Sequence, residues 1–323
     1  MKDTIGWGIL GAGRIAGKFA TEAKLVPGAR LMAVGSRSVE KAEQFARQNG
    51  IERAYGSYAE LVADPDVDAI YVATLHPTHC EHTLLALGHG KAVLCEKPFA
   101  VTGREARMMI ERARERKLFL MEAMWSRFNP ITMQVRRWIA EGRIGEPRML
   151  TVDFGFRAGW NPESRLLNPA LAGGALLDVG VYVLAYASMV FGRPVQIQAA
   201  AHIGETGVDE QTAMVLKYAG GQIASLTCAV RTPSPQGARI DGTEGAIEIP
   251  AFWRAPTARL IRPKEDPIEA AGEIGFQFEI AEAMACLRAG EIESPNMPLD
   301  ETLSIAETMD EVRRQIGLKY PFE

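Results

Sequence analysis

Four side chains able to hold or move a proton stand in two short motifs, Glu96-Lys97-Pro98 and Asp178-Val179-Gly180-Val181-Tyr182. Asp178 and Tyr182 are four residues apart, so on a helix they share a face with Cβ atoms about 5–6 Å apart. A free phenol has a pKa of about 10, which a nearby cation such as Lys97 lowers. We therefore expect Tyr182 to exchange a proton with a hydroxyl or carbonyl group. Lys97 would lower the pKa of Tyr182 and bind the same oxygen, and Asp178 would orient the substrate or Lys97. The spacing fits equally well a buried helix in which Tyr182 is hydrogen-bonded and Asp178 ion-paired.

A glycine turn near the N-terminus predicts a phosphate-binding site. Gly11 permits the tight turn, Gly13 lets the backbone approach a pyrophosphate, and Ala16 lets the following helix pack closely on the preceding strand. Arg14 and Ile15 open that helix, whose N-terminal N–H groups and dipole favour phosphate. The turn therefore predicts a dinucleotide-binding site, and a turn that binds nothing is the alternative.

The end of the predicted strand 29–35 bears on the choice of cofactor. NAD-specific folds carry an acidic residue there for the ribose 2′-hydroxyl, whereas this chain has Ser36 and Arg37. A guanidinium beside a hydroxyl suits a 2′-phosphate, so we expect NADP(H) in preference to NAD(H). A solvated surface arginine is the alternative.

Three histidines and a cysteine lie between residues 74 and 82, after the predicted strand 68–73. They suggest zinc, but His79 and His82 would lie on a helix whose first turn is already capped by Thr78, and no second group of ligands follows. We expect no metal. Instead we expect Thr74, His76 and His79 to line the cofactor at the carboxyl ends of the strands, with structural histidines as the alternative.

The predicted strand 91–95 ends at Glu96-Lys97-Pro98. A doubly wound sheet binds ligands at the carboxyl ends of its strands, which places Lys97 where cofactor and substrate meet. A cis Lys97–Pro98 bond is possible. A surface lysine paired with Glu96 is the alternative.

Two domains must hold these motifs, because 323 residues exceed what one hydrophobic core usually supports. Residues 1–122 alternate strand and helix patterns, which predicts a Rossmann doubly wound parallel sheet. Its strands are expected at 4–10, 29–35, 68–73, 91–95 and 118–122. Helix starts are marked by the capping boxes Ser57/Glu60, Thr78/Glu81 and Thr102/Glu105.

Residues 123–323 predict an α+β domain for substrate binding and oligomerisation, with a large, mostly antiparallel sheet. Helices are expected from Gly173 to about Val190 and at 276–289 and 301–317, and Gly180 predicts a close backbone approach. The strands are expected at 151–156, 196–203, 208–218, 221–231, 237–241, 245–249 and 258–262.

Composition excludes several classes of protein. With 47% hydrophobic and 24% charged residues and a net charge of −4, the chain lacks the basic balance of a nucleic-acid-binding protein. We find no apolar run that predicts a membrane span and no signal-peptide pattern. The four cysteines have no paired spacing, which favours reduced thiols and a cytoplasmic location.

Taken together, the motifs resemble the glucose-fructose oxidoreductase / inositol dehydrogenase / rhizopine-catabolism (Gfo/Idh/MocA) superfamily over nearly the whole chain. The matching segments are Gly11-Ala12-Gly13-Arg14-Ile15-Ala16, Glu96-Lys97-Pro98 and Asp178-Val179-Gly180-Val181-Tyr182. Many members have His at the position of Tyr182. The Tyr version is similar to the branch with dimeric dihydrodiol dehydrogenase and NADP-dependent D-xylose 1-dehydrogenase.

The resemblance implies an NADP(H)-dependent oxidoreductase that acts on a carbinol or carbonyl carbon of an aldose, sugar derivative or cyclic diol. It implies that Lys97 and Tyr182 are catalytic, and that the second-domain sheet forms a homodimer or homotetramer interface. The residues expected to face the cofactor are Ser36, Arg37, His76, His79, Glu96 and Lys97. Those expected at the substrate are Trp125, Arg127, Phe154 and Trp253, with core packing as the alternative for Trp253.

Two other functions compete with this one. A cofactor-binding sensor or co-regulator would need no proton carrier, so Lys97, Asp178 and Tyr182 argue against it. A glycosidase that uses transient oxidation at a sugar carbon would retain its nicotinamide through turnover, whereas a dehydrogenase releases it.

Overall fold

The computed structural model describes residues 3–323, which fall into two units. The first unit runs up to Trp125 and takes in Gly275–Leu303, and the second consists of Ser126–Ile274 and Ser304–Glu323. The expected boundary after residue 122 lies close to the first crossing between the units. Residues 275–303 were predicted to belong to the second domain, but they pack in the first unit. The amphipathic pattern of a helix does not show which of two sheets the helix covers.

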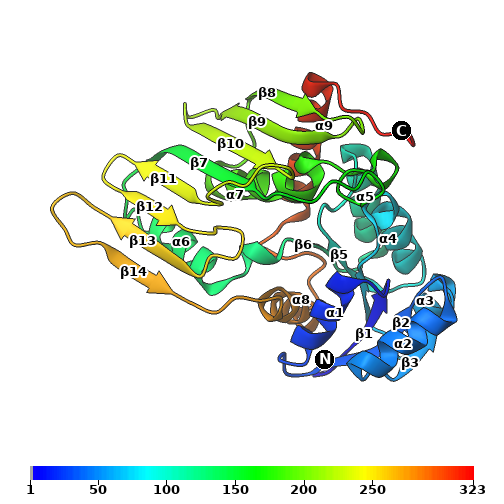
Figure 1. Ribbon diagram of the computed structural model, residues 1–323. Coiled ribbons are helices and arrows are strands. Elements are labelled where there is room, and N and C mark those ends of the chain that lie inside the picture. Colours follow the sequence, from blue (N-terminus) through cyan, green and yellow to red (C-terminus); the bar gives the residue numbers. More distant parts are fainter. Residues whose placement is uncertain (1–2) are drawn as a thin grey trace. The chain divides into compact units, whose positions relative to one another are not determined.

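The first unit is built on a six-stranded parallel sheet with the order β3-β2-β1-β4-β5-β6, as expected of a Rossmann fold (Figure 1). Five of these strands match the predicted ones within a few residues. The short, half-buried β3 was not predicted, because three residues carry no readable pattern. The strands are β1 (Ile5–Leu10), β2 (Ala29–Gly35), β3 (Arg53–Tyr55), β4 (Ala69–Val72), β5 (Ala92–Glu96) and β6 (Leu120–Ala123).

Two of the three predicted capping residues cap their helices. Thr102 forms a full capping box with Glu105, and Ser57 accepts a hydrogen bond from the backbone N–H of Glu60. The Thr78 prediction is wrong: its hydroxyl donates to the Leu75 carbonyl, and residues 76–78 form a 3₁₀ turn ahead of the helix. The helices of this unit are α1 (Arg14–Ala23), α2 (Val39–Asn49), α3 (Tyr58–Ala63), α4 (His79–Gly88), α5 (Gly103–Arg116) and α8 (Gln277–Ala289).

The second unit contains an eight-stranded sheet with the order β14-β13-β12-β11-β7-β10-β9-β8. All neighbours are antiparallel except β7 and β10, which confirms the mostly antiparallel prediction. The exposed edge strand β14 was not predicted. The strands are β7 (Pro147–Gly155), β8 (Gln196–Ile203), β9 (Asp209–Lys217), β10 (Ile223–Ala229), β11 (Ala238–Gly242), β12 (Ala246–Ile249), β13 (Thr257–Ile261) and β14 (Ile268–Ala271).

Helices cover one face of this sheet. α6 (Pro130–Ala140) contacts β13 and β14, and α7 (Val181–Phe191) contacts β7 and β10 (Figure 1). Along β9 buried residues alternate with exposed ones, so the other face is open. The long helix α9 (Leu299–Ile316) enters this unit from Ser304 onward.

The segment Pro169–Phe191 is contrary to the expectation that no apolar run is long enough to predict a membrane span. By length and composition alone it could cross a membrane, with a mean hydropathy of 1.7. However, 78% of its apolar window is buried inside the protein, as in the core helix of a folded domain.

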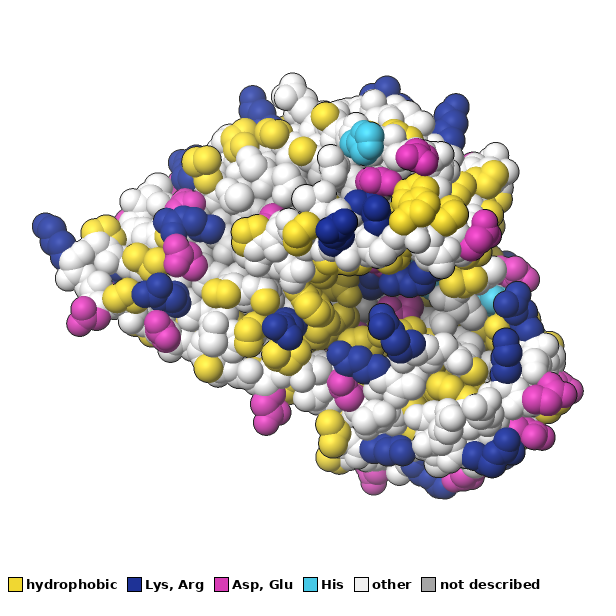
Figure 2. Space-filling model, in the orientation of Figure 1, with side chains coloured by type: hydrophobic (Ala, Val, Ile, Leu, Met, Phe, Trp, Pro, Cys, Tyr) yellow, Lys and Arg dark blue, Asp and Glu magenta, His cyan; other side chains and the backbone are white. Residues whose placement is uncertain are grey.

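On the face shown in Figure 2, Lys and Arg side chains are interspersed with Asp and Glu, in keeping with the small net charge.

Candidate active site

The glycine turn connects β1 to α1 and leaves room for a phosphate group. Gly11 has a φ of +109°, and a Cβ there would lie 2.8 Å from the carbonyl oxygen of Ala73, so only glycine fits. A Cβ at Gly13 would meet nothing within 4 Å, and no side chain caps the helix that follows. Arg14 is exposed and Ile15 half-buried at the first positions of α1. The open space before uncapped N–H groups fits a pyrophosphate.

Ser36 and Arg37 follow directly after β2. Ser36 is buried, whereas Arg37 is exposed and near enough to Tyr58 and His82 to influence their pKa values. The expected contact of Arg37 and Ser36 with a 2′-phosphate stays a prediction.

The loop after β4 is held by His79, which is completely buried at the start of α4. Its Nδ1 lies 2.8 Å from the carbonyl oxygen of Pro98 and its Nε2 3.2 Å from that of Thr74. Burial lowers the pKa of His79 to about 4, so the ring is neutral at pH 7 and its one N–H donates to one of these carbonyls. His79 therefore supports the loop that carries Thr74 and the half-buried His76. The expected contact of these three residues with a cofactor stays a prediction.

The side chains that suggested zinc do not gather around a common point. His82 Nδ1 lies 3.0 Å from the hydroxyl of Thr74, and burial raises the pKa of the Cys80 thiol to about 11. Within residues 3–323 there is no group of three or more His, Cys, Asp and Glu side chains that could hold a metal ion.

The Glu96-Lys97-Pro98 motif ends β5. The buried Glu96 carboxylate accepts a hydrogen bond from the hydroxyl of Tyr71 and another from the backbone N–H of Lys97, the latter at 3.2 Å. Phe19 of α1 stacks on Tyr71. The Lys97–Pro98 bond is cis, and the Lys97 side chain is half-buried. Glu96 thus fixes the backbone from which Lys97 extends.

Asp178 and Tyr182 are carried by one continuous helical segment, but its first part is not the α-helix expected from Gly173 onward. Residues Leu176–Gly180 form a π-helical turn, and α7 follows. Such turns are frequent at functional sites. A Cβ at Gly180 would lie 3.0 Å from the sulfur of Cys228, which confirms the close approach predicted there.

Asp178 forms an ion pair with Arg165, whose Nη1 lies 2.7 Å from the carboxylate. Asp178 is buried, while Arg165 is half-exposed on the loop between β7 and the helical segment. Arg165 was not predicted from the sequence, because a residue in an irregular loop has no periodicity that ties it to a partner. The ion pair is the one that the structural alternative for Asp178 required, and its role in orienting the substrate or Lys97 stays a prediction.

Two stacked aromatic side chains lie beside Tyr182, which is only 7% exposed. The Phe154 ring lies 5.4 Å from the Tyr182 ring, and Trp253 stacks on Phe154 with ring centroids 5.2 Å apart. The Trp253 indole N–H donates to Gln236 at 2.9 Å. Two of the predicted substrate residues therefore lie together with Tyr182.

The other two predicted substrate residues lie on either side of the first crossing between the units. Trp125 ends the first unit, where its ring lies 5.3 Å from that of Phe276 and 4.7 Å from the Lys18 ammonium. Arg127 is 3% exposed and belongs to the second unit. For both, a role at the substrate stays a prediction.

Comparison with known proteins places this arrangement in a family. A model of an oxidoreductase family with an NAD-binding Rossmann fold matches residues 5–124, and a GFO/IDH/MocA C-terminal domain model matches 132–248. The trans-1,2-dihydrobenzene-1,2-diol dehydrogenase of Mus musculus is 40% identical over 98% of this chain and 98% of its own.

Two solved structures are also similar along almost their whole length. The 3-ketoreductase KijD10 of Actinomadura kijaniata, in complex with NADP and TDP-benzene, has a TM-score of 0.86 and 27% identity over 97% of this chain and 98% of its own. The aldose-aldose oxidoreductase of Caulobacter crescentus, complexed with glycerol, has a TM-score of 0.89 and 26% identity over 97% of both chains. The resemblance found in the motifs is thereby confirmed, and the chain belongs to the GFO/IDH/MocA oxidoreductase family.

Proposed function

We propose that this oxidoreductase uses NADP(H) and acts on a carbinol or carbonyl carbon of a cyclic diol, an aldose or a sugar derivative. The observation that carries the proposal is the grouping of Asp178, Tyr182, Phe154 and Trp253 around one π-helical turn. The nicotinamide, when bound, supplies the hydride chemistry. Tyr182 exchanges the proton of the substrate oxygen, and Lys97 is the cation that lowers the pKa of Tyr182.

The substrate class follows from the aromatic side chains beside Tyr182. The half-buried Trp253, which is held in place by stacking on Phe154, offers a broad, rigid face that suits the apolar face of a six-membered ring. Arg165 neutralises Asp178, so that carboxylate orients a substrate hydroxyl and does not act as the base. The names of the similar proteins, a dihydrodiol dehydrogenase and an aldose-aldose oxidoreductase, support ring-shaped polyols as substrates.

The test is the absorbance of reduced nicotinamide during incubation with NADP⁺ and a panel of trans-dihydrodiols, aldoses and inositols. We expect turnover with at least one panel member and a slower reaction with NAD⁺. Tight NADPH binding without turnover in either direction would favour the sensor instead. Cleavage of a glycosidic bond by protein that keeps its nicotinamide bound would favour the glycosidase.

Arg37→Ala tests the cofactor preference. Loss of a charge-assisted hydrogen bond to the 2′-phosphate, about 1.5–3 kcal/mol, should raise the Kd for NADPH about 10- to 100-fold. The Kd for NADH should change little, since NADH has no 2′-phosphate. Arg30→Ala is the matched control, because Arg30 is an exposed arginine near the start of β2, the strand that Arg37 follows, and it pairs with Glu52 at 2.7 Å. Equal losses for NADPH and NADH would show that Arg37 does not bind the 2′-phosphate.

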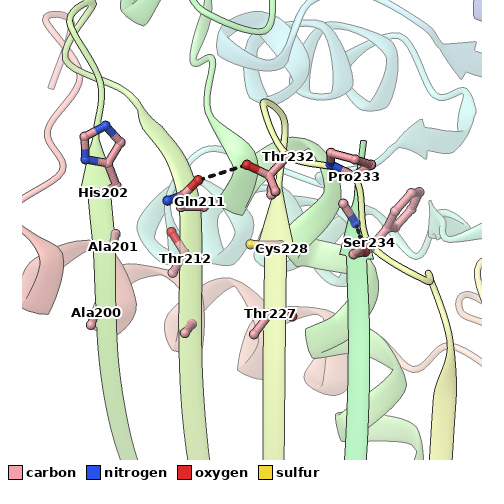
Figure 3. A pocket seen from close by; sticks show the side chains of 14 residues that line it. Ala200, Ala201, His202, Gln211, Thr212, Thr227, Cys228, Thr232, Pro233 and Ser234 are labelled. Atoms are coloured by element: carbon pink, nitrogen blue, oxygen red, sulfur yellow. Dashed lines mark hydrogen bonds between the residues drawn. The ribbon is translucent and has the colours of Figure 1, made fainter. Parts of the chain in front are cut away.

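We further propose that a second copy of the chain covers the open face of the eight-stranded sheet. Small exposed side chains, among them Ala200, Ala213 and Thr227, line a hollow of about 450 Å³ on this face (Figure 3). Val215 and Met149 are 44% and 55% exposed. Analytical ultracentrifugation should show a dimer or tetramer, and the Ala213→Arg substitution should shift the oligomeric state toward monomer. A monomeric wild-type protein at micromolar concentration would contradict the proposal.

A further inference from the structure

Asp209 is a completely buried carboxylate at the start of β9, and the proposed reaction does not use it. Its Oδ2 accepts hydrogen bonds from the backbone N–H of Leu176 at 2.8 Å and from the Thr212 hydroxyl at 2.7 Å. The backbone N–H groups of Ala175 and of Asp209 itself also donate to the carboxyl group. Burial raises the pKa of Asp209 to about 7, although these hydrogen bonds act in the opposite direction. Burying such a group is costly, so its position calls for an explanation.

The Asp209 carboxylate touches the entry to the π-helical turn. Gly174 has a φ of +118°, and a Cβ there would overlap Oδ1 of Asp209. The Tyr320 hydroxyl donates to the carbonyl oxygen of Gly173 at 2.8 Å, which ties the same entry to the C-terminal segment. At the far end of the turn, Gly180 packs against Cys228 of β10. The turn is therefore held at both ends against neighbouring strands.

Leu176 is the first residue of this turn and lies just ahead of the residues proposed to act on the substrate. Asp178 follows two residues later and Tyr182 six residues later. A change in backbone direction at Leu176 would move both side chains together. Through its hydrogen bond with the Leu176 N–H, the buried Asp209 can therefore set the positions of the Asp178 and Tyr182 side chains.

We infer that Asp209 is a positioning residue, which fixes the π-helical turn and thereby the placement of Asp178 and Tyr182. The inference rests on the proposed function, since it assigns a purpose to the position of Tyr182. Asp209 itself touches no substrate. It acts through the backbone of Leu176.

Asp209→Ala removes the acceptor and should lower kcat at least about tenfold, while the Kd for NADPH, which is bound by the other unit, changes little. Hydrogen exchange of the 174–180 backbone should become faster. Asp209→Asn should restore most of kcat, because an amide oxygen accepts the same two hydrogen bonds. Wild-type kcat in folded Asp209→Ala protein would overturn the inference, as would equal losses in the Ala and Asn variants.

Asp64→Ala separates positioning from general destabilisation. Asp64 is also buried and accepts a hydrogen bond from the Tyr55 hydroxyl at 2.9 Å, but it lies at the end of α3 in the first unit. The Asp64→Ala substitution should lower the melting temperature and leave kcat of the folded protein unchanged. If Asp209→Ala does not fold, Asp209→Glu takes its place. The extra methylene should displace the turn and lower kcat, and wild-type kcat would again overturn the inference.

Tyr182→Phe is measured in parallel so that two failures can be told apart. Full activity in Tyr182→Phe contradicts the proposed function. A slow Tyr182→Phe together with a fully active Asp209→Ala contradicts the positioning role alone.

Discussion

Tyr182→Phe should lower kcat by about 10²–10⁴-fold, the usual contribution of a positioned acid or base. The substitution removes only the hydroxyl. The ring keeps its place next to Phe154, so the fold loses little packing. The Kd for NADPH should stay near its wild-type value, because the glycine turn and Arg37 belong to the other unit. Steady-state kinetics with the best panel substrate and NADPH fluorescence titration measure the two quantities.

Tyr186→Phe is the matched control. Tyr186 lies one turn later on α7, is buried, and its hydroxyl has no hydrogen-bond partner in the described part of the chain. Burial raises the pKa of this phenol, so it is a poor proton carrier. Removing an unsatisfied buried hydroxyl should leave kcat unchanged and should not reduce stability. If both variants kept full activity, Tyr182 would have no part in proton exchange.

The sequence predicts the first unit well because its signals are local. Buried parallel strands are continuous apolar runs, and the turn at Gly11 and Gly13 has a steric cause that can be read directly. The elements that escaped prediction, β3 and β14, are short and partly exposed, so neither shows a clear pattern. The Thr78 prediction failed because residues 76–78 form a 3₁₀ turn that leads into α4, so the Thr78 backbone, with φ of −109° and ψ of 2°, lacks the extended conformation of an N-cap residue.

In the second unit, the contacts that hold the π-helical turn could not be predicted from the sequence alone. The cost of glycine inside a helix correctly indicated a close contact at Gly180, but not that the contact is Cys228 or that the turn is π-helical. Arg165 and Asp209 both contact the turn from positions far along the chain or in irregular loops. Their partners depend on how β7, β9 and β10 pair, and strand pairing is not encoded in the spacing of any one motif.

Gly13→Val should raise the KM for NADP⁺ about 10²–10⁴-fold, since losing two charge-assisted hydrogen bonds of about 1.5–3 kcal/mol each has that effect. The backbone of Gly13 is extended, with φ of −94°, a conformation that valine adopts without strain. A Cβ there meets no protein atom within 4 Å, so the melting temperature should change little. The new side chain would instead occupy the space in front of the α1 N–H groups, where the pyrophosphate is expected.

Gly17→Ala is the control for that experiment, because it adds a side chain one turn further along α1, where a Cβ meets only Phe45 at 3.9 Å. It should leave the KM for NADP⁺ unchanged. Gly11→Ala should behave differently from both, with a lower melting temperature, since the φ of +109° and the nearby Ala73 carbonyl oppose any side chain. If Gly13→Val bound NADPH as tightly as the wild type, the pyrophosphate could not lie over this turn. Arg37 would then have no 2′-phosphate within reach, and the cofactor preference would fail along with the glycine assignment.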